Sequence, residues 1–381
     1  MTGTTAQPTG TVRRDSRAFT VVVCVLVGLG AIPILLVVAL SGAPAITILA
    51  TVLAAVPVVP LVLCFLWLDR YEPEPRRLLL MALLWGAFVA TFGALVVQGL
   101  GGAFAGVTED ASLAVVAPVS EELTKGAFLL FLLWWRRAEL DRGLDGIVYA
   151  GMVGIGFAFT ENILYLGAAY NGSDGMGPGG IVGITTTFVL RCVFSPFAHP
   201  LFTAFTGIGI GLAVSSRRPL VRWLAPVGGY LLAVLAHGLW NGSTLFGAEG
   251  FFGTYLFIMV PAFAGLVWLG VWARRSERRM LTAALGDAAQ RGLIPATDIG
   301  WVVDLGARRL ARTHARQTGG KAAEDAMRDY QQAVIELGFL HHRYLRGTAP
   351  TDFAARGGDH VARINAVRPS IAFPGQVVPT R

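Results

Sequence analysis

The sequence predicts an all-α, polytopic membrane protein: a helical bundle of about eight spans, followed by a small helical C-terminal unit. Of its 381 residues, 54% are hydrophobic and only 14% are charged, and the mean hydropathy is +0.60. A typical globular protein has about 25% charged residues, and a soluble core could not bury this excess of apolar side chains. The apolar residues also fall into runs of roughly 20 or more, the length that crosses a bilayer as a helix.

The apolar runs give the spans in chain order. They are 18–40, 45–68, 78–100, 112–135, 144–170, 181–214, 223–246 and 252–273. The first run is not a cleavable signal peptide, because its apolar core is too long and no small-residue cleavage site follows it. The sixth run is too long for one straight helix and has Pro196 at its middle. We expect either one broken span or a re-entrant segment followed by a span, with a single net crossing.

Arginines alternate between the connections of these spans. They are Arg13, Arg14 and Arg17, then Arg70, Arg76 and Arg77, then Arg136, Arg137 and Arg142, then Arg217, Arg218 and Arg222, and finally Arg274, Arg275, Arg278 and Arg279. The intervening loops contain no Lys or Arg. The positive-inside rule then predicts a multi-pass plasma-membrane protein with both termini in the cytoplasm. No nucleic-acid partner is expected, because the basic residues form no stripe interleaved with aromatics.

Three regions follow from this pattern: a cytoplasmic N-terminal tail at 1–17, a transmembrane domain at 18–275 and a cytoplasmic helical unit at 276–381. The last region is mixed in charge and has apolar residues at helical spacing around Met280–Leu293, Val302–Leu310 and Met327–Leu345. From about Gly347 it contains glycine and proline, which indicates a mobile tail.

Polar side chains occur inside the fourth to seventh spans. They are Glu121, Glu122 and Lys125, then Glu161 and Asn162, then Arg191 and His199, and finally His237 and Asn241. Ionisable groups in hydrocarbon are costly and usually face a cavity or a partner, so this distribution predicts one common polar chamber. Glu121, Glu161 and His237 lie about 13–15 Å below the outer surface at about 1.5 Å per residue. The break at Pro196 could raise His199 to the same level.

Each of these residues also has a purely structural interpretation. Lys125 follows Glu121 by four residues and Glu122 by three, so it can neutralise a carboxylate and fix helix packing. The histidines and asparagines could be interhelical hydrogen-bond partners, and Arg191 could pair with Glu161 or Glu122. The convergence of two histidines and three glutamates at one depth favours catalysis, with carboxylates that activate water and imidazoles that bind a metal or an oxyanion.

The motifs in these spans resemble a known family. Glu121-Glu122-Leu123-Thr124-Lys125 matches the EExxK motif of the PrsW family of intramembrane proteases, and Phe157 to Glu161 resembles its FxxxE element. His199 stands where the third-motif histidine of the family should be, and His237 to Asn241 resembles the closing HxxxD element. The resemblance covers roughly residues 60–275, and the loop Asp69–Pro75 resembles a signature of actinobacterial members.

Two positions depart from the family pattern. Asn241 stands where members often have Asp, which resembles the related CAAX prenyl protease and bacteriocin-processing families. Ser195 occupies the position four residues before His199, where an aromatic is expected. A CAAX-type or bacteriocin-processing peptidase is therefore an alternative. A proton-coupled transporter, with the carboxylates as a proton relay, is a further alternative outside the protease class.

The resemblance implies a protease-like domain that hydrolyses a peptide bond within the bilayer, near its outer side. The candidate catalytic residues are Glu121, Glu122, Glu161, His199, His237 and Asn241. Tentative metal ligands are His199, His237 and Glu161, with zinc as the metal; a metal-free glutamate mechanism is the competing interpretation. The implied partners are the lipid bilayer and a membrane-anchored protein substrate, which in relatives includes anti-sigma factors.

The two adjacent glutamates are expected to have different roles. Consecutive helical positions diverge by about 100°, so Glu121 and Glu122 cannot point at the same atom. The resemblance places water activation on Glu121. Glu122 is left to hydrogen-bond a neighbouring helix or to help hold the water.

Overall fold

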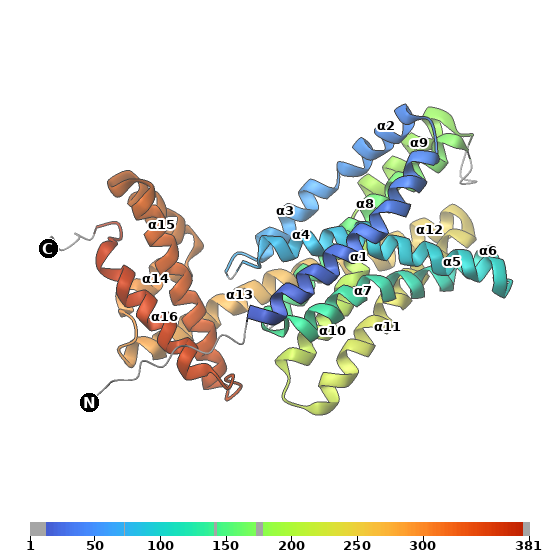
Figure 1. The fold of residues 1–381 in the computed structure, drawn as a ribbon. Helices are drawn as coiled ribbons and strands as arrows, with labels where there is room; N and C mark the ends of the chain where they lie inside the picture. The colour runs from blue at the N-terminus through green and yellow to red at the C-terminus, as the bar shows by residue number, and fades with distance from the viewer. Residues whose placement is uncertain (1–12, 72, 141–142, 173–177, 376–381) are drawn as a thin grey trace. The chain divides into compact units, whose positions relative to one another are not determined.

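The computed structural model describes residues 13–71, 73–140, 143–172 and 178–375, and all regular elements within these ranges are helices (Figure 1). This confirms the all-α prediction. Residues 1–12 of the predicted N-terminal tail, Arg142 and the chain end from 376 lie outside the described residues. The chain divides into a membrane unit (Met1–Asp69 and Glu74–Trp268) and a C-terminal unit (Arg70–Pro73 and Leu269–Arg381).

The membrane unit is a bundle of helices joined by short connections. Its helices are α1 (Arg13–Leu40), α2 (Pro44–Ala55), α3 (Val58–Leu68), α4 (Arg76–Leu84), α5 (Thr91–Ala105), α6 (Glu109–Ala111), α7 (Ala117–Trp135), α8 (Gly143–Asn171), α9 (Gly180–Phe188), α10 (Ala198–Ser215), α11 (Pro219–Ser243), α12 (Gly247–Thr254) and α13 (Val260–Gln290), which continues into the C-terminal unit. Four π-helical turns lie between them: η1 (Trp85–Ala90), η2 (Ser112–Val116), η4 (Val189–Phe194) and η6 (Tyr255–Met259).

Six helical stretches among the described residues are long and apolar enough to cross a membrane. They are Arg17–Leu40, Pro44–Leu68, Arg76–Ala105, Gly143–Asn171, Gly180–Ser215 and Pro219–Gln290. The predicted span 112–135 forms η2 and α7, but it is less apolar because it carries three charged side chains. The last stretch contains two predicted spans, since the chain turns at Gly247 (φ +67°) and α12 packs back against α11. The count of eight crossings stays a prediction.

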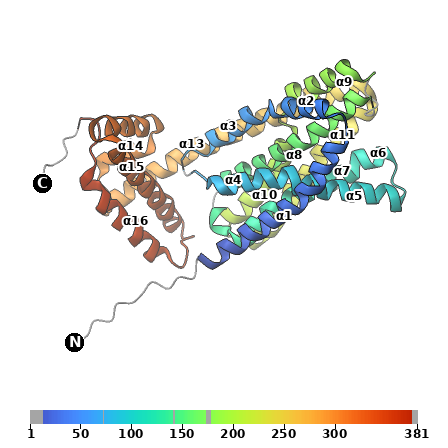
Figure 2. The same cartoon turned by 45° about the horizontal axis from the view of Figure 1, so that its top comes forward.

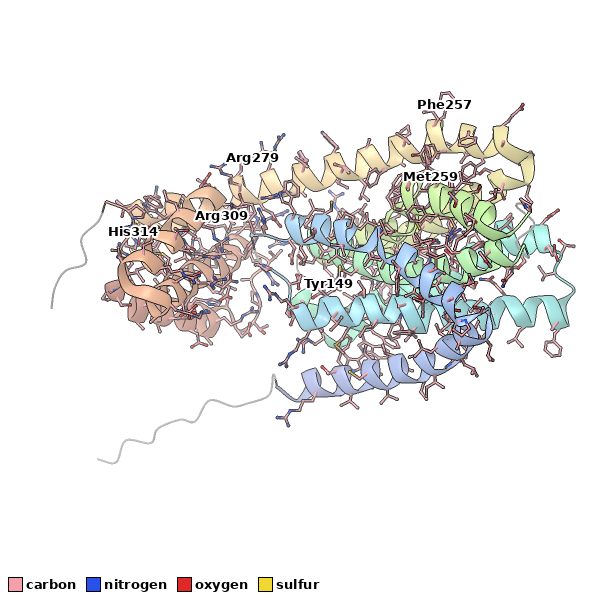
Figure 3. All side chains as sticks on the ribbon, turned by 90° about the horizontal axis from the view of Figure 1, so that it is seen from above. Tyr149, Phe257, Met259, Arg279, Arg309 and His314 are labelled. Carbon is pink, nitrogen blue, oxygen red and sulfur yellow. The ribbon has the colours of Figure 1, made fainter. Side chains whose placement is uncertain are left out.

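Side chains on the outside of the bundle are apolar, as a lipid environment requires. Figure 3 shows Phe257 pointing away from the bundle, where it is 77% exposed. Met259, two residues later, is buried. Large exposed apolar residues are likewise found along α1, α2, α3 and α11. Exposure of so many leucines, valines and aromatics is stable only next to lipid tails.

Helix α8 lies at the centre of the membrane unit. In its most apolar stretch 78% of the residues are buried, compared with at most 44% in the other candidate spans. It contacts α2, α3, α4, α7, α9 and α10. Two glycines bring α8 and α10 into backbone contact, because a Cβ on Gly146 would lie 2.2 Å from the carbonyl oxygen of Gly207. Any larger side chain there would force the helices apart.

The predicted sixth span is one broken helix that runs antiparallel to α8. Helices α9 and η4 end at Ser195, and α10 begins at Ala198, on the other side of Pro196. Proline has no amide hydrogen and disfavours helical geometry in the residue before it, which accounts for the break. Gly183 faces Ala169 of α8, and Gly211 faces Gly143 at the opposite end of α8. Figures 1 and 2 show α9 beside α2 and α10 beside α11.

The C-terminal unit is a small helical domain with its own core. It contains the end of α13, then α14 (Ile299–Val303), α15 (Leu305–Leu345), kinked at Gly320, and α16 (Phe353–Val367). Asp298 is fully buried and accepts hydrogen bonds from the Tyr330 hydroxyl at 2.5 Å and from the Arg368 guanidinium. Burial and the Asp298 carboxylate raise the pKa of Tyr330 well above its usual range, so this phenol keeps its proton and remains a donor.

Two features of this unit differ from the sequence expectation. The segment after Gly347, expected to be a mobile tail, forms α16 and then buries Ile371 and Phe373 in the core. Its apolar residues recur on one helical face, and packing of that face outweighs the adjacent Gly357 and Gly358. Tyr71, from the connection between α3 and α4, also belongs to this core and is 4% exposed.

A substitution at Gly154 tests the close packing that positions α10. A Cβ at this residue would lie 2.7 Å from the backbone of Pro200 and 2.8 Å from that of His199. We expect Gly154→Ala to destabilise the protein by about 1–3 kcal/mol and to lower its melting midpoint in detergent. Gly228→Ala is the matched control, because nothing lies within 4 Å of its Cβ position. Equal midpoints for the two variants would contradict this packing.

Candidate active site

Three ionisable side chains of α7 are buried inside the membrane unit. Glu121 is 4% exposed, and Glu122 and Lys125 are 0% exposed. Helical spacing brings both carboxylates to one ammonium group, as the sequence indicates. The Nζ atom of Lys125 lies 3.2 Å from Oε2 of Glu121 and 2.9 Å from Oε1 of Glu122. Lys125 therefore neutralises part of the charge of this pair in the interior of the bundle.

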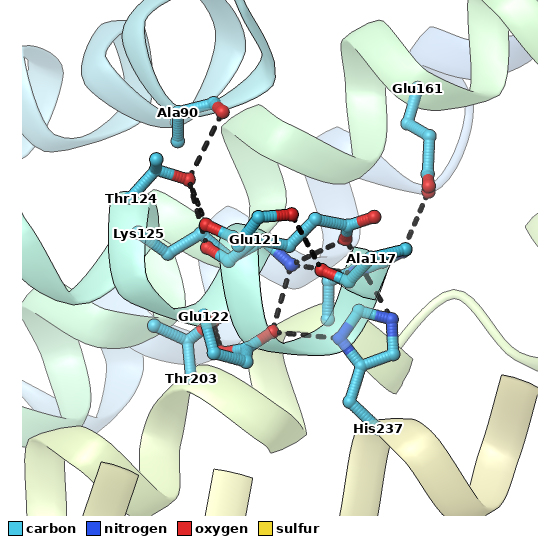
Figure 4. Close-up of polar contacts among 12 residues, drawn as sticks. Ala90, Ala117, Glu121, Glu122, Thr124, Lys125, Glu161, Thr203 and His237 are labelled. Carbon is cyan, nitrogen blue, oxygen red and sulfur yellow. Dashed lines mark hydrogen bonds and ion pairs between the residues drawn. The ribbon is translucent and has the colours of Figure 1, made fainter. Parts of the chain in front are cut away.

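Glu122 joins three helices. Its Oε1 accepts from Lys125 and lies 3.0 Å from Nδ1 of His237 on α11, and its Oε2 accepts from the hydroxyl of Thr203 on α10 at 3.1 Å. Figure 4 shows the Glu122 carboxylate between these three partners. These are the contacts with neighbouring helices that the sequence analysis expected of the second glutamate. Its oxygens are saturated, which suits a positioning role.

Glu161 of α8 is held by two partners across the chamber. Its Oε2 lies 2.7 Å from Nε2 of His199 and forms an ion pair with Arg191 of η4. The Nε atom of Arg191 also donates to Oδ1 of Asn162 at 2.8 Å. Of the two partners considered for Arg191, Glu161 is the one that it pairs with. The break at Pro196 starts α10 at Ala198 and thereby brings His199 to this level.

The neighbours of each imidazole determine its tautomer. Nδ1 of His199 lies 3.0 Å from Nζ of Lys125, which can only donate, so the ring proton of His199 is on Nε2 and points at Glu161. His237 donates from Nδ1 to Glu122 by the same reasoning, and its Nε2 lies 3.7 Å from Oε2 of Glu121. One lone pair of each histidine is thus turned toward the middle of the site.

Glu121, His199 and His237 form a group that could hold a metal ion. Their ligand atoms all lie within 4.8 Å of one another, and all three residues are buried. Two imidazoles and one carboxylate are a common donor set of catalytic zinc. The second nitrogen of each imidazole contacts a carboxylate, Glu161 for His199 and Glu122 for His237. Metal-bound histidines usually have such a partner, so the residues fit a metal ion.

The group differs from the ligand set expected from the sequence in one member. Glu121 belongs to it, whereas Glu161, expected as a ligand, contacts His199 from the opposite side. The reason is the direction of the side chains: Arg191 and His199 draw Glu161 toward η4 and α10. Sequence spacing could not distinguish these two arrangements.

A cavity opens beside His199. Its wall includes Glu161, Arg191, His199 and Asn241, with contributions from α8, η4, α10 and α11. The Nδ2 atom of Asn241 donates to the carbonyl oxygen of Leu113 at 3.2 Å. Asn241 is therefore a wall residue of the cavity and is not a member of the Glu–His–His group. The cavity is large and polar enough at its wall to admit a peptide group.

Two contacts of the site were not anticipated. Thr203 follows His199 by four residues and so shares its helix face, a spacing that could have identified it. Gln98 of α5 donates to Oε1 of Glu121 at 3.5 Å. A glutamine in an otherwise apolar span was the available signal for this contact.

Residues 74–266 match the PrsW family of intramembrane metalloproteases. The match covers about half of the chain and includes all six candidate residues. The chain belongs to the PrsW family. It is an intramembrane protease, and the transporter alternative is set aside. The matched region ends before α14, so the family does not account for the C-terminal unit.

Individual relatives agree with this assignment. Protease PrsW of Geobacillus kaustophilus is 30% identical over 220 residues, which are 57% of this chain and 84% of that protein. Protease PrsW of Bacillus subtilis is 27% identical over 231 residues, which are 58% of this chain and 92% of that protein. No solved structure matches the chain.

The two glutamates should respond differently to substitution by glutamine. We expect Glu121→Gln to lower proteolysis of a reconstituted reporter by roughly 100-fold or more while the melting midpoint changes little. Glu122→Gln should retain more activity but lose about 1–3 kcal/mol of stability, because its contacts join α7, α10 and α11. The reverse pattern would exchange the two roles, and two inert substitutions would remove both from the mechanism.

Proposed function

We propose that the chain hydrolyses a peptide bond of a membrane-anchored protein at Glu121, His199 and His237, with zinc as the cofactor. The observation that carries this proposal is the convergence of one carboxylate and the two available imidazole nitrogens in a buried group. The charge balance supports it. Three carboxylates face only two cations, Lys125 and Arg191, and a bound cation would offset the remaining negative charge in a low-dielectric environment.

The residues divide into those that would hold zinc and those that position them. Glu121, His199 and His237 are the proposed ligands, and the metal supplies Lewis-acid polarisation of the peptide carbonyl and a nucleophilic water. Glu161 and Glu122 orient the two imidazoles by accepting their second N–H groups. The peptide enters through the cavity beside His199, where the Asn241 amide on the wall helps to orient it.

A metal-free glutamate mechanism is the second candidate. It is favoured by the contact of Lys125 with both carboxylates, which reduces the charge of the site without a metal. In this mechanism Glu121 takes a proton from water as the water oxygen attacks the peptide carbonyl, and then delivers that proton to the leaving amine nitrogen. His237 would stabilise the oxyanion. The two mechanisms share their residues and differ in the metal.

The location of the site and the nature of the substrate extend this proposal. The arginine pattern supports a plasma-membrane protein with both termini, and hence the C-terminal unit, in the cytoplasm. Reporter fusions at the two termini test this orientation. The site then lies in the outer half of the bilayer, and mapping the cut in the substrate tests that depth. An anti-sigma factor with a single span is the proposed kind of substrate.

Chelation distinguishes the two mechanisms. We expect 1,10-phenanthroline to lower cleavage of a membrane-anchored reporter in proteoliposomes by roughly 100-fold or more, and zinc to restore it. The non-chelating isomer 1,7-phenanthroline is the matched control and should leave the rate unchanged. Full activity after the metal has been removed would favour the glutamate mechanism instead.

A further inference from the structure

Lys125 occupies the middle of the group that would hold the metal. Its ammonium has three N–H donors and no lone pair. Three acceptors lie around Nζ: Glu122 Oε1 at 2.9 Å, His199 Nδ1 at 3.0 Å and Glu121 Oε2 at 3.2 Å. The donors of the ammonium are therefore fully used. Two of these acceptors belong to residues of the metal-binding group.

The contact with His199 excludes metal binding at the same nitrogen. Because Nε2 of His199 donates to Glu161, Nδ1 carries the one ring lone pair that is available. That lone pair can accept a hydrogen bond from Lys125 or bind a cation, but it cannot do both. The same holds for the Glu121 oxygen that Lys125 contacts, where two cations would also repel each other.

From this geometry we infer that Lys125 is an internal cation that fills the metal site when it is empty and must withdraw for a metal ion to bind. The inference rests on the metal site of the proposed function. While Lys125 is in place, it compensates Glu121 and Glu122 and stabilises the buried site. It also lowers the affinity for zinc, because ligands must be taken from it before a metal can bind.

Two contacts outside the metal-binding group give Lys125 a second position. Glu122 is not a member of that group and remains within reach as an ion-pair partner. The ring of Phe157 on α8 lies 3.7 Å from Nζ, a favourable cation–π distance. The ammonium can therefore release Glu121 and His199 while it keeps one carboxylate and one aromatic ring.

The first test measures zinc affinity in full-length protein that has been stripped of metal and kept in detergent, against a fluorescent zinc indicator. We expect Lys125→Met to bind zinc at least about tenfold more tightly than wild type, because hydrogen bonds to charged groups no longer have to be broken. Lys321→Met is the control: it removes the only other lysine of the chain, which is exposed and pairs with Asp325. Its affinity should equal that of wild type.

A second measurement uses wild type and does not depend on the folding of a variant. Protein labelled with ¹⁵N-lysine contains two labelled side chains, and the Lys321→Met spectrum assigns them. Saturation with zinc should shift the Lys125 Nζ signal and leave that of Lys321 unchanged, whereas magnesium should shift neither. An unchanged Lys125 signal at zinc saturation, or equal zinc affinities of wild type and Lys125→Met, overturns the inference alone. Absence of zinc binding in every protein overturns the metal site itself.

Discussion

The cost of ionised side chains in the interior of a membrane protein governs this structure. Glu121, Glu122 and Glu161 are surrounded by apolar helices, and each would be prohibitively unstable without a partner. Lys125 and Arg191 supply those partners, and both histidines contribute further hydrogen bonds. The network is satisfied only if α7, α8, α10 and α11 meet at one level. The glycine contacts of α8 and the break at Pro196 allow them to do so.

Much of the fold can be predicted from the sequence, because the length and composition of an apolar run are one-dimensional signals. The break in 181–214 follows from Pro196, which cannot continue the hydrogen-bond ladder. Helix α16 could not be predicted in the same way, since Gly357 and Gly358 weaken its local signal and its stability comes from packing. The burial of Tyr71 with residues more than 200 positions away depends on tertiary structure alone.

The candidate site shows the same division. The residue types are visible in the sequence because a charge or a histidine in an apolar run is unusual, and the structure brings Glu121, Glu122, Glu161, His199 and His237 together. The sequence cannot show which oxygen faces which nitrogen. Glu161 therefore emerged as a partner of Arg191 and His199, and Glu121 as the carboxylate of the Glu–His–His group. Thr203 was detectable only by its spacing from His199.

The metal content of the purified full-length protein tests the central claim most directly. The Glu–His–His group predicts about one zinc ion per chain by elemental analysis. The ion should be lost in folded His237→Ala protein and retained in His314→Ala, whose histidine lies on α15, outside the group. Wild-type protein that contains no transition metal and still cleaves its substrate at the full rate would contradict the account.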